Sequence, residues 1–267
     1  MKRSSLDMLC CPMCRGALSL SGPTPPEVLA DGTFSCASCQ SRFAIEAGIP
    51  HFIRPEGLVG SNKKHEKLNN WFSHVCTPAT KLMFAVCGGE ENARRECLDR
   101  LDRRPQAKIL EIGIGTGDNL PYLTKRLGSG EIYGLDIARS MLQYCQRNLA
   151  KWNLEAELFL GEAEHLPFKD GMFDIVYHLG AINFFTDQKR AIEEMIRVAK
   201  PGTKIVIADE SEKALKVLDK FLLQLWIGQR EEVVPPIDLV PKTMLDVRLD
   251  TIWKGYGYCI EFRTPLR

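Results

Sequence analysis

The sequence has almost no net charge and no long hydrophobic run. Its 267 residues include 35 lysines and arginines against 34 aspartates and glutamates, so it lacks the basic excess that general binding to nucleic-acid phosphates requires. No uninterrupted apolar run approaches the length of about 18 residues that a transmembrane helix needs. A charged and then apolar leader with a small-residue cleavage site is not visible either. We therefore expect a cytoplasmic protein without a membrane span.

Cysteine, by contrast, is plentiful, with ten residues in the chain. In a protein expected in the cytosol, this content favours metal ligation and buried thiols over disulfides. Cys11 and Cys14 form one C-x-x-C pair and Cys36 and Cys39 another, with 21 residues between the pairs. Tetrahedral zinc takes four thiolates from two such pairs, which leaves no position open for water. The sequence therefore predicts a structural zinc site that supplies folding energy to its surroundings.

The remaining cysteines lack this spacing. Cys10 adjoins the first pair, but we prefer Cys11 as the ligand because the proline that follows it shapes the knuckle. Five further cysteines are predicted to be ordinary buried thiols: Cys76, Cys87, Cys97, Cys145 and Cys259.

Three regions with different patterning follow one another. Residues 1–58 are rich in turns and contain strand-like runs such as FSCASCQSRFAI, which predict a hairpin in a small module with little core of its own. Residues 59–104 carry apolar residues at helical spacing and predict a lid or linker of two or three helices. In residues 105–267 strand-like runs alternate with helix-like segments, and two further strand-like runs follow. This region predicts an α/β fold: a doubly wound, mostly parallel, seven-stranded sheet with a terminal antiparallel hairpin.

A glycine-rich loop follows the first strand of this region. In ILEIGIGTGDNL, Gly113, Gly115 and Gly117 stand between a strand and a helix, where glycines allow close approach of a nucleotide cofactor. The third glycine comes one residue too early for a dinucleotide fingerprint, and Asp118 occupies its place. The negative charges of Glu111 and Asp118 disfavour a pyrophosphate but suit a ligand with an ammonium group and a sulfonium centre. S-adenosylmethionine (SAM) has both.

The next two strands end in further candidates for cofactor contacts. Asp136 ends a strand about 20 residues later, where a carboxylate can accept hydrogen bonds from both ribose hydroxyls. Ile137 and Met141 supply apolar neighbours for the ribose and adenine. In GEAEHLPF, Glu162 could accept the adenine amino group while Ala163 offers its backbone amide.

The fourth strand brings His178 to the carboxyl edge of the sheet, where ligands of such sheets bind. Methyl transfer is an in-line displacement in which positioning supplies much of the acceleration, so a base is not obligatory. Three roles stay open for His178: catalytic base, contact with cofactor or substrate, and plain packing. His74 could reach the site from the lid, and Asp209 with Glu210 could orient an acceptor or cap a helix.

An amphipathic segment could line an apolar acceptor pocket, although helical spacing favours ordinary core. Its apolar residues are Leu218, Phe221, Leu222, Leu225 and Trp226.

Two parts of the chain resemble known families. LDMLCCPMCRGAL and FSCASCQSRFAIEAGIPHFI resemble the Trm112-type zinc ribbon, and such domains accompany or activate methyltransferases. From about residue 62 to 267, ILEIGIGTGDNLPYL, YGLDIARSML, GEAEHLPF, FDIVYHLGAINFF and RVAKPGTKIVIADES resemble a class I SAM-dependent methyltransferase of the UbiE-like group (methyltransferase type 11). This second resemblance implies a Rossmann-like fold with SAM contacts at residues 111–117, 136, 137, 162 and 163, and with His178 or its neighbours near the methyl-donor pocket. Glu162 stands where Asp is commoner in the family.

The sequence thus predicts a SAM-dependent methyltransferase with a small-molecule acceptor, lipid-like or quinone-like. An RNA base methyltransferase is the alternative, since a zinc module ahead of this fold also resembles the bacterial ribosomal-RNA guanine methyltransferases. Those place a histidine among the metal ligands, however, and residues 1–67 hold only eight Lys and Arg against six Asp and Glu, which is too little charge to argue for RNA. A second alternative is a non-catalytic SAM-binding partner or activator, which an incomplete cofactor motif would favour; no motif is incomplete here.

Overall fold

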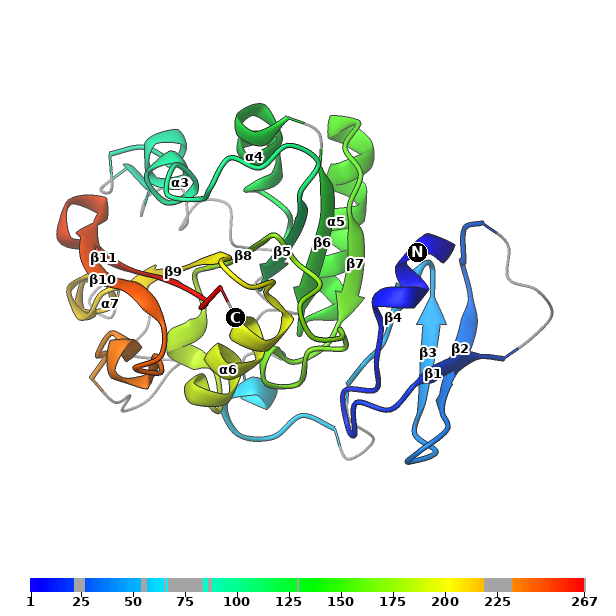
Figure 1. The fold of residues 1–267 in the computed structure, drawn as a ribbon. Helices are drawn as coiled ribbons and strands as arrows, with labels where there is room; N and C mark the ends of the chain where they lie inside the picture. Colours follow the sequence, from blue (N-terminus) through cyan, green and yellow to red (C-terminus); the bar gives the residue numbers. More distant parts are fainter. Residues whose placement is uncertain are drawn as a thin grey trace.

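The structure is a computed structural model that describes residues 1–21, 27–53, 57–64, 66, 84–85, 88–128, 130–218 and 232–266. Its main element is a seven-stranded sheet of order β10-β11-β9-β8-β5-β6-β7 (Figure 1). The parallel strands are β5 (Lys108–Ile112), β6 (Glu131–Asp136), β7 (Glu157–Leu160), β8 (Ile175–Leu179) and β9 (Lys204–Glu210). An antiparallel hairpin of β10 (Leu245–Ile252) and β11 (Gly257–Arg263) pairs with β9. The predicted fold class is confirmed.

Helices follow the strands where the sequence periodicity predicts them. They are α3 (Glu90–Leu98), α4 (Leu120–Leu127), α5 (Arg139–Trp152), α6 (Gln188–Val198) and α7 (Glu212–Leu218). Local signals set their ends: α4 stops at Gly128 with a φ of 73°, and α5 at the left-handed Asn153. Helix α6 begins after Asp187, whose side chain accepts a hydrogen bond from the Arg190 amide at 2.9 Å.

The sheet has a separate hydrophobic core on each face. Successive residues of a strand point to opposite faces, so Ile109 of β5 packs with α3, α4 and α5, whereas Leu110 and Ile112 pack with α6. In β8, Tyr177 belongs to the first core and Val176 to the second. Figure 1 shows α4 above the sheet, α5 beside β6 and β7, and α6 below the sheet. Because both faces are covered, the parallel strands are apolar almost throughout.

The N-terminal module is a four-stranded antiparallel sheet of order β1-β2-β3-β4. Its elements are the 3₁₀ helix η1 (Arg3–Met8), β1 (Leu18–Leu20), β2 (Gly32–Cys36), β3 (Arg42–Glu46) and β4 (Ile49–Pro50). The hairpin predicted from FSCASCQSRFAI forms between β2 and β3, with Phe34 opposite Phe43. Both phenylalanines are buried, and their rings lie 5.8 and 5.2 Å from the ring of Phe52.

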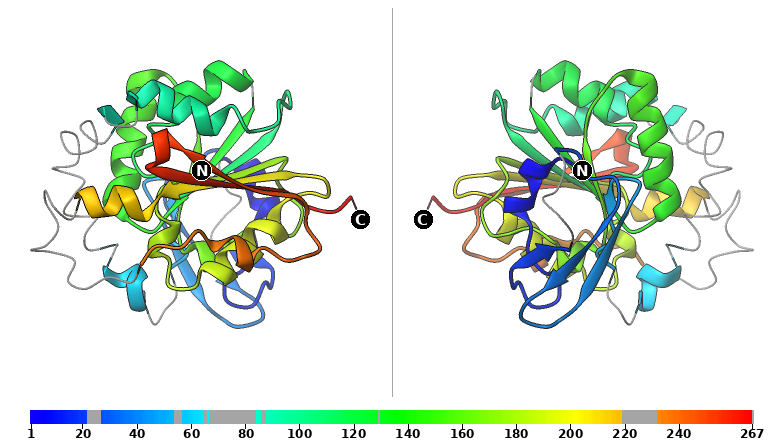
Figure 2. Two further views of the ribbon diagram at one scale, coloured as in Figure 1. Left: turned by 90° about the vertical axis from the view of Figure 1, so that its left-hand side faces the viewer. Right: turned by 90° about the vertical axis from the view of Figure 1, so that its right-hand side faces the viewer.

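The module lies against β7, the outer parallel strand (Figure 2). His51 forms a parallel bridge with Leu160, and the Phe52 amide donates to the Leu160 carbonyl at 2.6 Å. Leu9 forms an antiparallel bridge with Phe168 beyond the end of β7. The two sheets share one core, because buried residues of both belong to the same hydrophobic cluster. The module therefore covers an edge strand that would otherwise present unpaired backbone groups.

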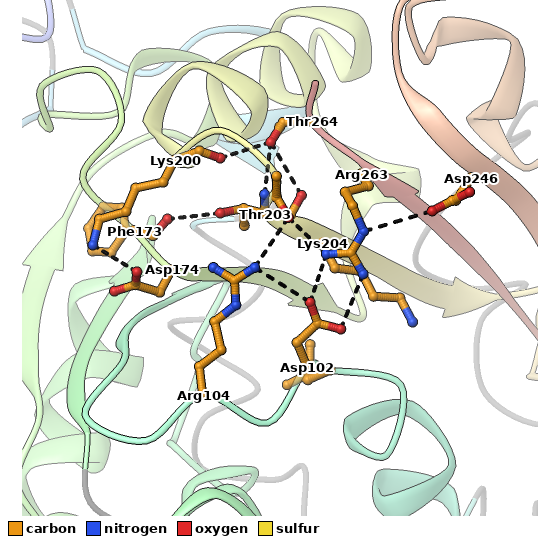
Figure 3. A network of polar contacts seen from close by, with 12 residues as sticks. Asp102, Arg104, Phe173, Asp174, Lys200, Thr203, Lys204, Asp246, Arg263 and Thr264 are labelled. Carbon is orange, nitrogen blue, oxygen red and sulfur yellow. Dashed lines mark hydrogen bonds and ion pairs between the residues drawn. The ribbon is translucent and has the colours of Figure 1, made fainter. Parts of the chain in front are cut away.

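Polar contacts close the amino end of the parallel strands (Figure 3). Arg263 donates to the Asp102 carboxylate at 2.8 Å, and Lys200 to Asp174, just before β8, at 2.7 Å. The Thr264 hydroxyl donates to the Lys200 carbonyl at 2.8 Å. These contacts tie the segment after α3 to β8, β9 and β11. This end of the sheet is thus structural, and the carboxyl end carries the candidate site.

Several sequence predictions fall outside the described residues: His74, Cys76, Cys87, Phe221, Leu222, Leu225 and Trp226. The predicted amphipathic segment begins as α7, which ends at Leu218. Of the predicted lid, the structure describes α3 and a helical turn at residues 60–64. No helix in the described part of the chain is long and apolar enough to cross a membrane.

Candidate active site and metal centre

The four predicted metal ligands come together in the N-terminal module. The Sγ atoms of Cys11, Cys14, Cys36 and Cys39 all lie within 4.8 Å of one another. The Sγ atoms of Cys14 and Cys36 lie 3.4 Å apart, and those of Cys11 and Cys39 lie 3.6 Å apart. Zinc–sulfur bonds of about 2.3 Å in a tetrahedron place the sulfurs about 3.8 Å apart. The donor set and its spacing therefore fit a tetrahedral thiolate-bound metal.

The two knuckles share a backbone geometry. In each, the residue after the second cysteine is left-handed: Arg15 and Gln40 both have φ of 60°. The Arg15 amide donates to the Cys11 carbonyl at 2.8 Å, and the Gln40 amide to the Cys36 carbonyl at 3.0 Å. Close packing favours glycine at position 16 beside the first knuckle, because a Cβ there would lie 2.6 Å from Ser38 Oγ.

The cysteines outside the knuckles that the structure describes are buried thiols. Cys10 is buried and lies outside the group of four, with its amide bonded to the Pro167 carbonyl at 2.9 Å. Cys97, Cys145 and Cys259 are also free and buried, as predicted. Burial raises the pKa of the Cys10 thiol, so it is a poor metal ligand where it stands.

The glycine loop between β5 and α4 has the backbone that the sequence predicts. Gly113, Gly115 and Gly117 have φ of 71°, 56° and 79°, in the left-handed region that favours glycine. A Cβ at Gly117 would also meet Cys145 Sγ at 2.8 Å, and one at Gly113 would lie 3.2 Å from the His178 ring. Both backbone conformation and close packing therefore require glycine at position 117.

Glu111 is fully buried on the face of the sheet that α3, α4 and α5 cover. Its Oε1 accepts a hydrogen bond from Asn119 Nδ2 at 2.6 Å, and its Oε2 accepts one from the Tyr177 hydroxyl at 2.7 Å. Arg94 of α3 donates to Asn119 Oδ1 at 2.5 Å. Burial raises the pKa of Glu111 to about 7, although both hydrogen bonds act in the opposite direction. No sequence motif marks Tyr177 or Asn119 as partners of Glu111.

Asp136 at the end of β6 is bound to the glycine loop. Its Oδ2 accepts a hydrogen bond from the Gly115 amide and its Oδ1 one from the Ala138 amide, both at 2.8 Å. Burial raises the pKa of the carboxyl against the effect of these amides. Ile137 and Met141, the predicted apolar neighbours, are half-buried.

Glu162 and Ala163 lie where β7 leads into the 3₁₀ helix η2 (Ala163–His165), and both are buried. Oε2 of Glu162 accepts a hydrogen bond from Asn62 Nδ2 at 3.1 Å. Asn62 belongs to the helical turn at residues 60–64. No sequence motif marks Asn62, which stands in the polar run GSNKKHEK.

His178 is the penultimate residue of β8, on the face opposite Tyr177, and its side chain is fully buried. Its Nδ1 lies 2.7 Å from the Ile112 carbonyl. A carbonyl only accepts, so Nδ1 carries the proton and Nε2 presents a lone pair. Nε2 is buried and has no hydrogen-bond partner among the described residues, and burial lowers the pKa of His178 to about 4. The imidazole is thus a neutral acceptor at physiological pH, with its ring 5.0 Å from that of Phe185.

Asp209 at the end of β9 is fully buried and bound to backbone amides. Its Oδ2 accepts from the Asn183 amide and its Oδ1 from the Glu210 amide, both at 2.8 Å. The Tyr258 hydroxyl donates to Asn183 Oδ1 at 2.7 Å. Burial, reinforced by the charge of Glu210, raises the pKa of Asp209 well above its usual range. This aspartate orders the loop after β8.

The candidate cofactor residues gather at one edge. The glycine loop, Asp136, Glu162 and His178 follow β5, β6, β7 and β8, which are neighbours in the order β8-β5-β6-β7. The carboxyl ends of these parallel strands face the same way, so side chains far apart in sequence share one crevice edge. Loop glycines, carboxylates and a neutral imidazole suit a nucleoside ligand with positive charge rather than a phosphate.

Comparison with known proteins agrees with this arrangement. A family model described as a methyltransferase domain matches residues 109–202. The ubiquinone/menaquinone biosynthesis C-methyltransferase UbiE of Cupriavidus pinatubonensis is 35% identical over 180 residues, which cover 64% of this chain and 74% of that protein.

Two solved structures share the fold at 18% identity. One is a chain of the complex between the Haloferax volcanii Trm112 methyltransferase activator and the putative methyltransferase, with a TM-score of 0.57 over 74% of this chain and 97% of that one. The other is a putative SAM-dependent methyltransferase of Methanococcus maripaludis, with a TM-score of 0.56 over 79% of this chain and 97% of that one. Together with the UbiE relatives, the fold and the motif order show that the chain belongs to the UbiE-like class I SAM-dependent methyltransferases.

Proposed function

We propose that this enzyme transfers the methyl group of SAM to a small-molecule acceptor of lipid-like or quinone-like character. The observation that carries the proposal is the gathering of the glycine loop, Asp136 and Glu162 at the ends of adjacent parallel strands. Relatives named as quinone-biosynthesis C-methyltransferases support the acceptor class. The balance of 35 basic and 34 acidic residues supports a small molecule over RNA.

The cofactor contacts divide among the strand ends. Loop residues 111–117 hold the methionine part, where backbone without side chains permits close approach. Asp136 accepts the ribose hydroxyls, since an ionised carboxylate has lone pairs left after accepting two amides. Glu162 accepts from the adenine amino group, the Ala163 amide donates to the ring, and Ile137 and Met141 flank it. When bound, SAM supplies an electrophilic methyl group on a sulfonium.

We assign His178 as a hydrogen-bond acceptor in the methyl-donor pocket. Its Nδ1 is committed to the Ile112 carbonyl, and its pKa of about 4 makes it a poor general base near neutral pH. Its buried Nε2 suits a donor from cofactor or substrate. Catalysis then rests on holding donor and acceptor in line.

We further propose that zinc occupies the four-cysteine centre. Cys11, Cys14, Cys36 and Cys39 would hold it, which leaves no open position for substrate. The metal then fixes the knuckles of a module with a small core of its own.

The test is methyl transfer from labelled SAM. Purified protein is incubated with methyl-labelled SAM and a whole-cell extract, which is then separated into RNA, protein, lipid and small-molecule fractions. We expect label in the lipid or small-molecule fraction, and none with an Asp136→Ala control. Label in RNA would refute the acceptor class, and tight SAM binding without transfer to any fraction would favour an activator.

A further inference from the structure

Asn62 is a polar residue that lies almost wholly inside the protein, with 3% of its surface exposed. Reciprocal hydrogen bonds join it to Thr186, just before α6. The Asn62 amide donates to Thr186 Oγ1 at 3.0 Å, and the Thr186 amide donates to Asn62 Oδ1 at 3.1 Å. Because the carboxamide oxygen accepts from a backbone amide, the orientation of the Asn62 side chain is fixed by its partners.

The Nδ2 group of Asn62 lies between two buried glutamates. It donates to Glu162 Oε2 at 3.1 Å and to Glu164 Oε1 at 3.0 Å. Oε1 of Glu164 also accepts from the amides of Thr186 and Asp187, at 3.1 and 3.2 Å. Glu164 is therefore tied to the start of α6 without Asn62. The bond to Glu162 is different, since it reaches the carboxylate that the proposed function assigns to adenine.

Close packing keeps the segment that carries Asn62 in place. Gly60 has a φ of 56°, and a Cβ there would meet Thr186 Cγ2 at 2.8 Å. Thr186 Oγ1 also donates to the Val59 carbonyl at 3.2 Å. The backbone of residues 59–62 therefore packs closely against the loop before α6. Asn62 cannot retreat from Glu162 without breaking these contacts.

We propose that Asn62 is a positioning residue for the cofactor. It holds the Glu162 carboxylate in the orientation that accepts a hydrogen bond from the exocyclic amino group of adenine, and it offsets the repulsion between Glu162 and Glu164. The segment that precedes the methyltransferase motifs thereby becomes part of the cofactor site. This inference rests on the proposed role of Glu162.

The test compares S-adenosylhomocysteine with its inosine analogue, in which an oxo group replaces the adenine amino group and the adjacent ring nitrogen carries a proton. In Asn62→Ala we expect the affinity for S-adenosylhomocysteine to fall roughly tenfold, the effect of one hydrogen bond to a charged group. The affinity for the inosine analogue should change less than twofold, because that ligand gains nothing from an oriented Glu162. Equal losses for both ligands would overturn the proposal and make Asn62 merely structural.

Asn62→Asp keeps the volume and replaces the donor by a third acid within about 3 Å of two others. We expect its affinity for S-adenosylhomocysteine to fall further than that of Asn62→Ala, because a third carboxylate has no donor for Glu162 and repels it. An affinity equal to that of the wild type would contradict the proposal. Lys64→Ala, an exposed residue of the same helical turn, is the matched control and should leave both affinities unchanged.

A Glu162→Ala variant, which removes the acceptor, distinguishes the role of Asn62 from the proposed role of Glu162. If Glu162→Ala leaves the preference for the adenine ligand intact, the role of Glu162 is wrong and the inference falls with it. If Glu162→Ala weakens the preference and Asn62→Ala does not, only the role of Asn62 is wrong.

Discussion

The Tyr177 hydroxyl donates to Oε2 of Glu111 at 2.7 Å between two side chains that are both fully buried. Alternation along β5 and β8 places both on the same face of the sheet, beneath the glycine loop. A carboxyl group in this setting has its pKa raised to about 7, so its ionisation is sensitive to pH and to a nearby positive charge.

SAM affinity should therefore depend on the ionisation of Glu111. We expect SAM to bind more tightly at pH 8 than at pH 6, because the ionised carboxylate attracts the ammonium and sulfonium charges. Tyr177→Phe removes a hydrogen-bond donor to the ionised Glu111 carboxylate, so the pKa of Glu111 should rise further and the inflection in SAM affinity should move to higher pH. Calorimetric titration of SAM at several pH values checks both the wild type and this variant. In Glu111→Gln, SAM affinity should not change with pH over this range. A flat wild-type profile would exclude Glu111 as the titrating group.

Glu111 should also affect the stability of the ligand-free protein, with a defined sign. Its folded-state pKa of about 7 lies above the usual carboxyl value of 4.5. The contribution of Glu111 to the free energy of unfolding is therefore fully present below about pH 4.5 and is lost as pH rises through 7. The free energy of unfolding of wild type relative to Glu111→Gln should fall between pH 5 and pH 8, as measured by urea denaturation at several pH values. A difference independent of pH would contradict this assignment.

Replacement of Gly117 by alanine should be more harmful than the same change at another left-handed glycine. At Gly117 a Cβ adds a 2.8 Å contact with Cys145 Sγ to an unfavourable φ of 79°. Gly171 has a φ of 64° with nothing within 4 Å of a Cβ, so it isolates the backbone effect. We expect a loss of about 1 kcal/mol for Gly171→Ala and about 2–4 kcal/mol for Gly117→Ala. Only the second should weaken SAM binding; equal losses of stability would show that Cys145 gives way.

Removal of the metal should weaken SAM binding as well as the module. The Phe52 amide donates to the Leu160 carbonyl at 2.6 Å and the Cys10 amide to the Pro167 carbonyl at 2.9 Å. Leu160 and Pro167 flank the segment with Glu162 and Ala163, the residues proposed to contact adenine. Chelation or Cys36→Ala should lower both the melting temperature and SAM affinity, since the loosened module no longer fixes that segment. Cys10→Ala should keep the metal content unchanged. Full SAM affinity in metal-free protein would show that the two sites are independent.

Glu194 joins the first knuckle to the methyltransferase fold, and its loss should be costly. Its side chain is 3% exposed and accepts from Arg15 at 3.1 Å, from Arg197 at 2.6 Å and from the Leu166 amide at 3.0 Å. Glu194→Gln leaves the mostly buried Arg197 side chain partly unpaired and should cost about 3 kcal/mol. Arg15→Ala should cost under about 1 kcal/mol, because that side chain is half exposed. Urea denaturation measures both, and a reversed order would contradict this account.

Local signals explain how much of this molecule the sequence could predict. The spacing of Cys11, Cys14, Cys36 and Cys39, the glycine loop and the strand periodicity are short-range patterns, and each appears in the structure where the sequence predicts it. Contacts between segments that are distant in the sequence produce no short-range pattern from which they could be predicted. Asn62 lies 100 residues from Glu162 in sequence and Arg15 lies 179 from Glu194. Such pairs become neighbours only after the sheet and the module have packed together.

The chemistry of His178 shows the same limit. Its position at the end of β8 was predictable from the strand pattern. The protonation state of His178 was not predictable. It depends on the Ile112 carbonyl, which belongs to the neighbouring strand β5, and on the burial of the ring in the folded protein.

The most direct test of the central claim is SAM binding by wild-type protein and by Asp136→Ala, with zinc content measured in the same samples. We expect the wild type to bind SAM with a dissociation constant on the order of micromolar and the variant to bind it roughly a hundredfold more weakly, because two charge-assisted hydrogen bonds to the ribose are lost. The zinc content should be equal in both proteins, because the substitution does not touch the metal centre. An Asp136→Ala variant that binds SAM as tightly as the wild type would contradict the assignment of this strand edge as the cofactor site.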